Sequence, residues 1–128
     1  MATTGSGALV RGFFAAYGTG DLDAVRSALA EDLVAYVTNA EGGADVVHGR
    51  EPYMRRLPDL PAAGGSLEVT QVLEVDAQDV LVMVELRARR EGRDLHNFAA
   101  FLARVREGNV SHLWMVEALP AYSDEFWS

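Results

Sequence analysis

Three long apolar segments, separated by two short turns that contain glycine, dominate the second half of this 128-residue chain. The segments are 79–90, 95–105 and 109–119, and the turns read EGRD at 91–94 and REGN at 106–109. Tight turns between apolar segments are typical of β-hairpins. Consecutive hairpins with apolar strands predict a mostly antiparallel sheet with one face packed against the rest of the chain.

The middle segment, LHNFAAFLARV at 95–105, also fits a helix. Its residues Phe98, Phe101, Leu102 and Val105 recur at i, i+3, i+4 and i+7, the spacing of an amphipathic helix. A strand buried on both faces has an equally continuous apolar pattern. The residues of this segment alone leave both structures open.

The first half of the chain predicts helices at 7–17, 22–30 and 50–60, with strands at 33–38 and 66–75. Glycines 18 and 20 end the first helix, and Asp21 is placed to cap the second. Residues 39–45 predict a loop, and residues after Pro120 a short acidic and aromatic tail. This order predicts an α+β fold in one domain, 1–128, with residues 1–6 flexible.

Composition excludes several kinds of chemistry. The chain has no cysteine, so disulfides, thiol nucleophiles and cysteine-bound zinc are excluded. All 11 basic residues are arginine, which excludes a lysine Schiff base. A net charge of −8 argues against nucleic-acid binding. The apolar runs are too short to span a membrane and Met1–Gly7 lacks the pattern of a signal peptide, so we expect a cytoplasmic protein.

Three longer segments, in this order and spacing, resemble the nuclear transport factor 2-like superfamily, and within it the SnoaL-like and ketosteroid-isomerase-like branch. They are FFAAYGTGDLDAVRSALAEDLVAYV, HGREPYMRRL and FLARVREGNVSHLWMVEALPAYSDEFW. The resemblance implies a cone-shaped fold in which a curved, mostly antiparallel sheet wraps around the N-terminal helices and leaves a pocket at its mouth. In that family the segment matching 95–105 is a central strand between 79–90 and 109–119, and members are often homodimers.

Steroid isomerases of this family use a carboxylate base and an oxyanion hole made by a tyrosine and a protonated aspartate, with a second tyrosine in support. Carried onto this sequence, the oxyanion tyrosine falls on Phe13, the base on or beside Val37, the supporting tyrosine on Leu57 and the protonated aspartate on Phe101. All four positions are apolar. The sequence therefore predicts a hydrophobic pocket without the steroid-isomerase mechanism.

Strand alternation sorts the remaining side chains. If Phe101 faces the pocket, so do Asn97 on the same strand and Glu117 on the next. The predicted substrate-binding residues are Phe13, Tyr17, Val37, Tyr53, Leu57, Val84, Leu86, Ala99, Phe101, Leu113 and Met115. The predicted catalytic residues are Glu117, Asn97, Tyr36 and His48, with no metal and no cofactor.

Each candidate has a second interpretation. A Glu117 carboxylate among apolar side chains would have a raised pKa suited to proton transfer, but the same residue could lie in water at the strand end. Asn97 could hold a substrate carbonyl or bond neighbouring backbone. Tyr36 and Tyr17 could donate to a ligand or pack as core aromatics. His48 is placed at the pocket rim.

The other face of the sheet carries His96, His112 and Trp114, which we interpret as an interface with a second subunit. Six arginines are expected together at one hairpin end, as an anion site or, as we favour, a solvated surface. They are Arg87, Arg89, Arg90, Arg93, Arg104 and Arg106.

Two functions fit this sequence. The first is an enzyme that isomerises, cyclises or dehydrates a hydrophobic, polyketide- or terpenoid-like molecule without a cofactor. The second is a non-catalytic ligand-binding or dimerisation module with the same fold.

Overall fold

The computed structural model describes residues 5–128, within which the chain forms four helices and six strands. The helices are α1 (Gly5–Thr19), α2 (Leu22–Ala28), α3 (Arg50–Met54) and α4 (Pro120–Trp127). The strands are β1 (Leu29–Thr38), β2 (Ala44–His48), β3 (Gly65–Glu74), β4 (Asp79–Arg90), β5 (Arg93–Arg106) and β6 (Asn109–Glu117). The expected flexibility of residues 1–6 falls mostly on 1–4, outside the described residues, whereas Gly5 and Ser6 belong to α1.

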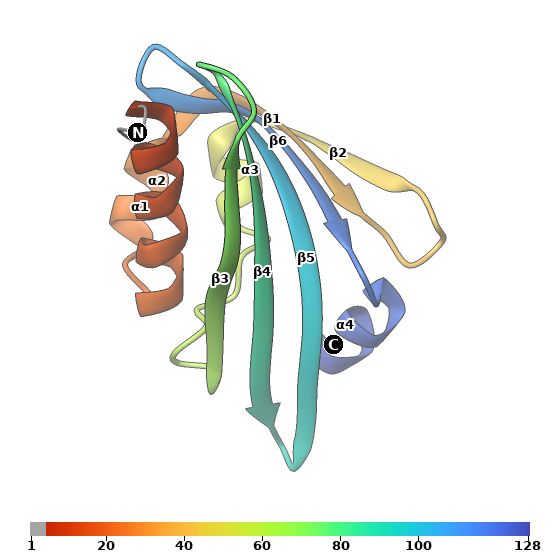
Figure 1. Cartoon of the computed structure of the whole chain (residues 1–128). Helices are drawn as coiled ribbons and strands as arrows, with labels where there is room; N and C mark the ends of the chain where they lie inside the picture. The colour runs from red at the N-terminus through yellow and green to blue at the C-terminus, as the bar shows by residue number, and fades with distance from the viewer. Residues whose placement is uncertain (1–4) are drawn as a thin grey trace.

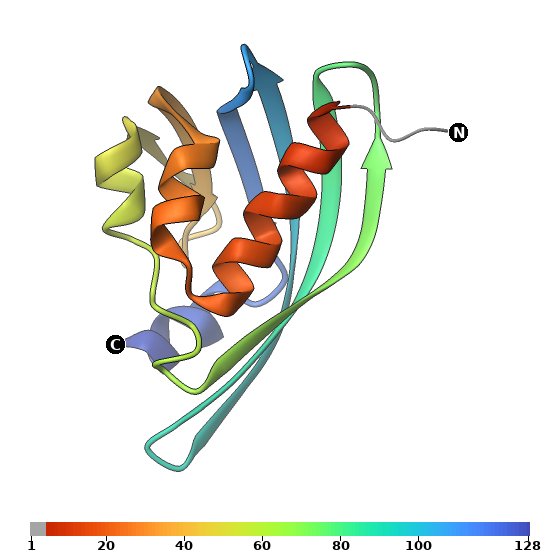
Figure 2. The same ribbon diagram turned by 90° about the vertical axis from the view of Figure 1, so that its left-hand side faces the viewer.

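The six strands form one curved sheet in the order β2-β1-β6-β5-β4-β3 (Figure 1). Every neighbouring pair is antiparallel except β1 and β6, which are parallel. The helices α1, α2 and α3 lie across one face of this sheet (Figure 2). The predicted α+β cone is therefore confirmed. Within residues 5–128, none of the helices combines the length and apolar character that a membrane span requires.

The segment 95–105 is a strand, β5, as the family resemblance implied and its local periodicity did not require. Two tight turns decide this, because Glu91-Gly92 and Glu107-Gly108 all have positive φ, at 52°, 76°, 55° and 80°. Two consecutive positive φ values match the twist of a two-residue hairpin. Phe101 then pairs with Val82 on β4 and with Met115 on β6. These non-local pairings outweigh the helical pattern.

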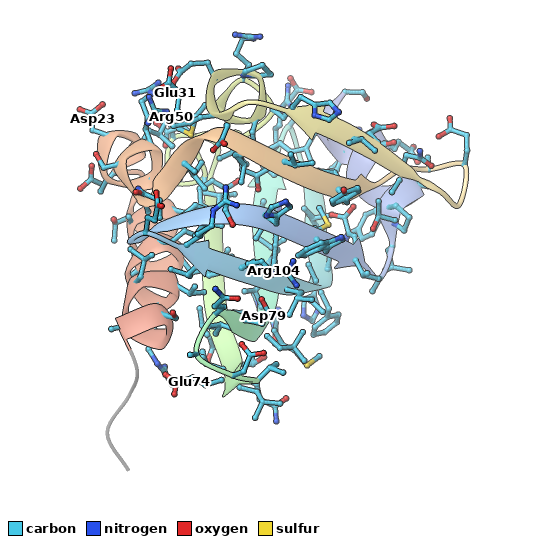
Figure 3. All side chains as sticks on the ribbon, turned by 90° about the horizontal axis from the view of Figure 1, so that it is seen from above. Asp23, Glu31, Arg50, Glu74, Asp79 and Arg104 are labelled. Carbon is cyan, nitrogen blue, oxygen red and sulfur yellow. The ribbon has the colours of Figure 1, made fainter. Side chains whose placement is uncertain are left out.

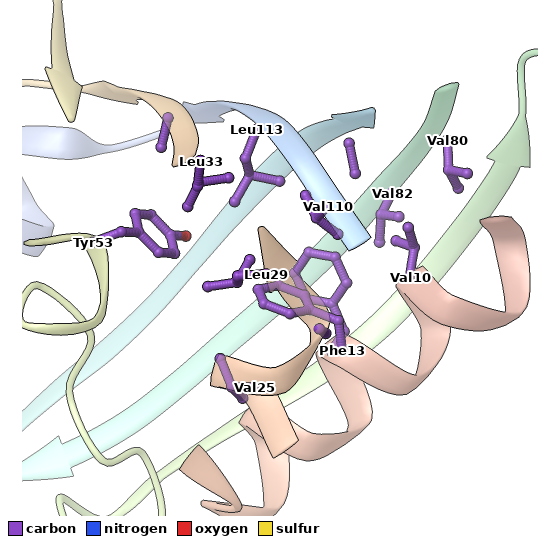
Figure 4. Packing of buried hydrophobic residues seen from close by; sticks show 14 of the residues in the cluster. Val10, Phe13, Val25, Leu29, Leu33, Tyr53, Val80, Val82, Val110 and Leu113 are labelled. Atoms are coloured by element: carbon purple, nitrogen blue, oxygen red, sulfur yellow. The ribbon is translucent and has the colours of Figure 1, made fainter. Parts of the chain in front are cut away.

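The core lies between the concave face of the sheet and α1 and α2. Val10 and Phe14 of α1 are almost fully buried in one cluster with inward residues of the sheet, including Val82 and Leu113. Figure 4 shows Val10 beside Val82. Phe14 meets Phe101 edge-on, with ring centroids 4.9 Å apart. Ala99 and Ala103 on β5 are small, which leaves room for these aromatic rings.

Two elements differ from the sequence-based expectation. Residues 44–48, expected partly as a loop, form the edge strand β2, in which Val47 alone is buried. The expected C-terminal tail is a helix, α4, which begins at Pro120 and packs Phe126 on Ala88 and Leu95. Proline at the start of a helix costs no hydrogen bond. The third helix is also shorter than expected and ends at Met54.

The six arginines do not gather at one hairpin end, and that prediction is wrong. Arg89, Arg90 and Arg93 lie at the β4–β5 turn. Arg104 lies near the opposite end of β5 and binds Asp79, with Nε and Oδ1 2.9 Å apart (Figure 3). A strand rises about 3.3 Å per residue, so more than ten residues separate the two groups widely.

Candidate functional site

A cavity of about 240 Å³ lies where α1, α3, the sheet and α4 meet. Its size is somewhat below the roughly 300–1,000 Å³ typical of small-molecule sites, so it suits a compact ligand. Phe13, Phe101 and Met115 line the cavity rather than filling it. The walls are mainly apolar and aromatic, and four acidic or phenolic groups interrupt them, as described below.

Eight of the predicted substrate-binding residues line this cavity: Phe13, Tyr17, Val37, Tyr53, Leu57, Leu86, Phe101 and Met115. The other three, Val84, Ala99 and Leu113, do not reach it. Each faces the same side of the sheet but is at most 3% exposed and packs inside the core. Strand alternation predicts which face of the sheet a side chain lies on, but not how far it lies from the opening of the cavity. The sequence therefore could not separate these three core residues from the residues that line the cavity.

Glu117 is the one predicted catalytic residue that lines the cavity. The side-chain hydroxyl of Thr38 accepts a hydrogen bond from the Glu117 backbone N–H at 3.2 Å and donates to the Met115 carbonyl at 2.7 Å. The end of β6 is thereby fixed against β1. Burial raises the pKa of the Glu117 carboxyl, the Ser123 hydroxyl opposes this by hydrogen bonding, and the nearby charge of Asp124 raises the pKa further.

Two phenols face the cavity from different helices, Tyr17 from α1 and Tyr53 from α3. Tyr53 is only 5% exposed and its ring reaches inward from α3 (Figure 4). Within the part of the chain that the structure describes, neither hydroxyl makes a hydrogen bond. Burial raises the pKa of both phenols, so both remain protonated and can donate to a ligand oxygen.

Asn97 is fully buried on the concave side of β5 but does not line the cavity. Its Nδ2 donates to the Leu119 carbonyl at 3.2 Å, and its Oδ1 accepts from the Leu119 N–H at 3.1 Å. The backbone interpretation of this residue is therefore the one that the geometry supports.

Tyr36 and His48 are also turned away from the cavity. Tyr36 stacks on Trp114 on the convex face of the sheet, with ring centroids 5.5 Å apart and planes inclined by 2°. Its neighbour Val37 faces inward, and adjacent residues of a strand point to opposite faces. His48 is exposed on β2 because Val47 takes the inward position.

Sequence reasoning missed the contribution of α4, which places Ser123, Asp124 and Trp127 on the cavity wall. The sequence does contain a signal for this helix. Counted from Ser123, Phe126 and Trp127 stand at i+3 and i+4, the spacing of one helix face, and Pro120 precedes them. Arg56 also reaches the cavity but is paired with Asp45 at 3.1 Å. Across residues 5–128, no group of three histidine or acidic side chains is arranged to hold a metal ion.

Comparisons with known proteins agree with this architecture. Residues 10–113 match the model of the SnoaL-like domain. An uncharacterized protein of Mycobacterium tuberculosis is 33% identical over 123 residues, which cover 94% of each chain.

Two solved structures share the fold. Bal32a, from a soil-derived mobile gene cassette, has a TM-score of 0.81 at 20% identity and covers 97% of each chain. A candidate SnoaL-like polyketide cyclase from a Jannaschia species has a TM-score of 0.74 at 15% identity, covering 93% of this chain and 89% of that one. At such identities the likeness concerns the fold alone.

Proposed function

The chain belongs to the SnoaL-like domain family, and from that premise we propose that it is an enzyme that moves protons on a compact hydrophobic molecule. The observation that carries the proposal is Glu117, a carboxyl group with a raised pKa in a cavity whose walls are mainly apolar. A carboxylate with a raised pKa is a stronger base than an ordinary glutamate, and a larger fraction of it is protonated near neutral pH, where it can serve as an acid.

The two free phenols complete the chemistry. Removing a proton beside a carbonyl places negative charge on the carbonyl oxygen, and donors directed at that oxygen stabilise the charge. Tyr17 and Tyr53 supply two such donors on the wall of the same cavity as Glu117. We therefore propose isomerisation, cyclisation or dehydration of a carbonyl compound of terpenoid or small polyketide type, carried out by side chains alone.

Proton exchange with solvent tests this function without knowledge of the product. The protein is incubated in D₂O with 2-tetralone or cyclohex-2-enone, and deuterium beside the carbonyl is measured by mass spectrometry. We expect the protein to accelerate exchange, and Glu117→Gln to remove most of the acceleration. Glu68→Gln, an exposed carboxylate on β3, is the matched control. Acceleration that persists in Glu117→Gln would overturn the assignment of the base.

A second function has one specific observation in its favour. Of the four predicted catalytic residues, Asn97, Tyr36 and His48 lie outside the cavity, which leaves Glu117 as the only acid or base among them. A cavity in which only one of the predicted catalytic residues is present can also belong to a protein that binds a hydrophobic molecule without changing it. Native mass spectrometry of the purified protein distinguishes the two, because a binding protein retains the same molecule unchanged after prolonged incubation.

We also propose that two copies associate through the convex face of the sheet. Met83, Ala100 and Val116 form a row across β4, β5 and β6, with Phe98 beside them. Met83, Phe98 and Val116 are 42%, 45% and 66% exposed, which is unusual for large apolar side chains that form one patch. His96, His112 and Trp114 lie on the same face around this patch.

A further inference from the structure

Asn97 extends the pairing of β5 with β6 beyond the end of the β6 strand. The strand ends at Glu117, and the next backbone bond runs from the Ala118 N–H to the Phe98 carbonyl at 2.8 Å. Asn97 then holds both backbone groups of Leu119 with its side-chain amide. A side-chain amide has one acceptor and one donor side, so it can replace a backbone partner. The residue immediately before α4 is thereby fixed.

Other anchors of α4 act along its length, beginning in the first turn with the Tyr122 hydroxyl, which donates to the Asp94 carbonyl. Arg90 and Arg93 donate to carbonyls at its C-terminal end, including Trp127 at 3.3 Å and Glu125 at 3.2 Å. Phe126 packs with Ala88 and Leu95 in a small cluster separate from the main core. A short helix with so few core contacts is a local unit that can loosen without global unfolding. The point at which the chain enters α4 is fixed by the two bonds between Asn97 and Leu119.

Helix α4 forms the part of the cavity wall that acts on Glu117. Ser123 bonds the carboxyl group, Asp124 repels its charge, and both come from α4. Trp127 also lines the cavity from the same helix. Displacement of α4 would change all of these contacts together.

We propose that Asn97 is a positioning residue that holds α4 in place through Leu119 and so sets Ser123 and Asp124 against Glu117. Asn97 itself does not touch the ligand. The inference builds on the proposed role of Glu117, yet Asn97 would hold α4 in the same way in a protein that only binds its ligand.

The test replaces Asn97 by leucine, which keeps a similar volume and removes both hydrogen bonds to Leu119. It also removes the bond that Oδ1 accepts from the Phe98 N–H at 2.9 Å. We expect hydrogen-exchange protection of residues 121–127 to fall on the order of tenfold or more, with little change in β4 and β6. We also expect the pKa of Glu117, followed by ¹³C NMR and assigned with Glu117→Gln, to fall toward its ordinary value. When α4 moves, burial and the charge of Asp124 are both lost, together with the opposing bond from Ser123, and burial is the largest of the three causes.

Ser111→Ala is the matched control. Ser111 is also a buried polar residue, 2% exposed, whose hydroxyl donates to the Arg104 carbonyl at 3.2 Å, at the other end of β6. Its loss should lower global stability and leave α4 protection and the Glu117 pKa unchanged. If Asn97→Leu does not fold, Asn97→Ala is measured in the same way.

Unchanged α4 protection and Glu117 pKa in the folded Asn97 variant would overturn the proposal, as would equal shifts in Ser111→Ala. These measurements require no turnover. Undiminished exchange in Glu117→Gln would therefore refute the proposed function without refuting the role of Asn97. Unchanged α4 protection in the Asn97 variant would refute that role without refuting the proposed function.

Discussion

Glu117 and Asp124 reach the same cavity from β6 and from α4, and the charge of Asp124 adds to burial in raising the pKa of Glu117. Two carboxylates that approach each other cannot both ionise as readily as isolated ones. The Ser123 hydroxyl, which bonds Glu117, limits this effect. The carboxyl group of Glu117 is thus adjusted by two neighbouring residues of one helix, and its titration is open to direct measurement.

The raised pKa of Glu117 predicts how stability depends on pH. Above its ordinary pKa of 4.5, the folded protein holds the Glu117 proton more tightly than the unfolded chain does. The contribution to stability is fully present below about pH 4.5 and is lost as pH rises through the folded-state pKa. We expect Glu117→Gln to gain stability relative to the native protein between pH 4.5 and neutrality.

Urea unfolding at a series of pH values measures this difference. Glu68 is exposed, so the unfolding free energy of Glu68→Gln should change with pH in the same way as that of the native protein over this range. The prediction is contradicted if the unfolding free energy of Glu117→Gln, relative to the native protein, stays constant or falls as pH rises.

Removal of the two phenolic hydroxyls in the cavity should weaken ligand binding and leave the unfolding free energy nearly unchanged. Tyr17→Phe and Tyr53→Phe each delete a hydroxyl that has no hydrogen-bond partner in residues 5–128, so the unfolding free energy should change by less than about 0.5 kcal/mol. Affinity for 2-tetralone should fall by about 0.5–1.5 kcal/mol per hydroxyl, the net value of one hydrogen bond. Ligand-observed NMR titration gives the affinity, and Tyr36→Phe on the convex face is the control. Equal losses in all three variants would show that the phenols do not contact the ketone.

Much of the sheet could be predicted from sequence because its determinants are local or periodic. The Glu91-Gly92 and Glu107-Gly108 turns set the hairpins, and alternation from Phe101 placed Met115 and Glu117 on the concave face. Distance from the mouth has no such signal, so Leu113 was placed at the cavity although it lies in the core.

The differences between the expected and the observed positions of the site residues have physical causes. Tyr36 and Val37 are neighbours in one strand, so only one of them can face the cavity, and the sequence does not say which. The partner of Asn97 is the backbone of Leu119, 22 residues away, and any residue type except proline at that position would offer the same groups. The cavity wall from α4 depends on the packing of Phe126, another non-local contact.

The chain just before β3 leaves no room for a side chain at Gly64. A Cβ atom there would lie 2.6 Å from the Arg89 carbonyl oxygen, and the residue has φ +75°. Gly42 has φ +86° but nothing within 4 Å of the same position. We expect Gly42→Ala to cost about 1 kcal/mol, the usual penalty of positive φ, and Gly64→Ala at least about 2 kcal/mol more because β3 must shift from β4. Denaturant unfolding of both variants measures the difference, and equal costs would show that the backbone yields freely at Gly64.

The convex apolar patch predicts the oligomeric state. Phe98 and Val116 lie on neighbouring strands beside Ala100, which pairs with Val116. A second copy that covers this patch removes both side chains from water, and a twofold axis places the same patch on each side of the contact. Phe98→Glu and Val116→Glu would each introduce a carboxylate opposite its own copy, so both should convert a dimer to a monomer in multi-angle light scattering. Val75→Glu, also an exposed apolar residue but in the β3–β4 turn, should leave the mass unchanged. A native protein that is monomeric at high micromolar concentration would refute this interface. If Val75→Glu dissociates as readily as Phe98→Glu, the contact between the copies does not lie at the patch.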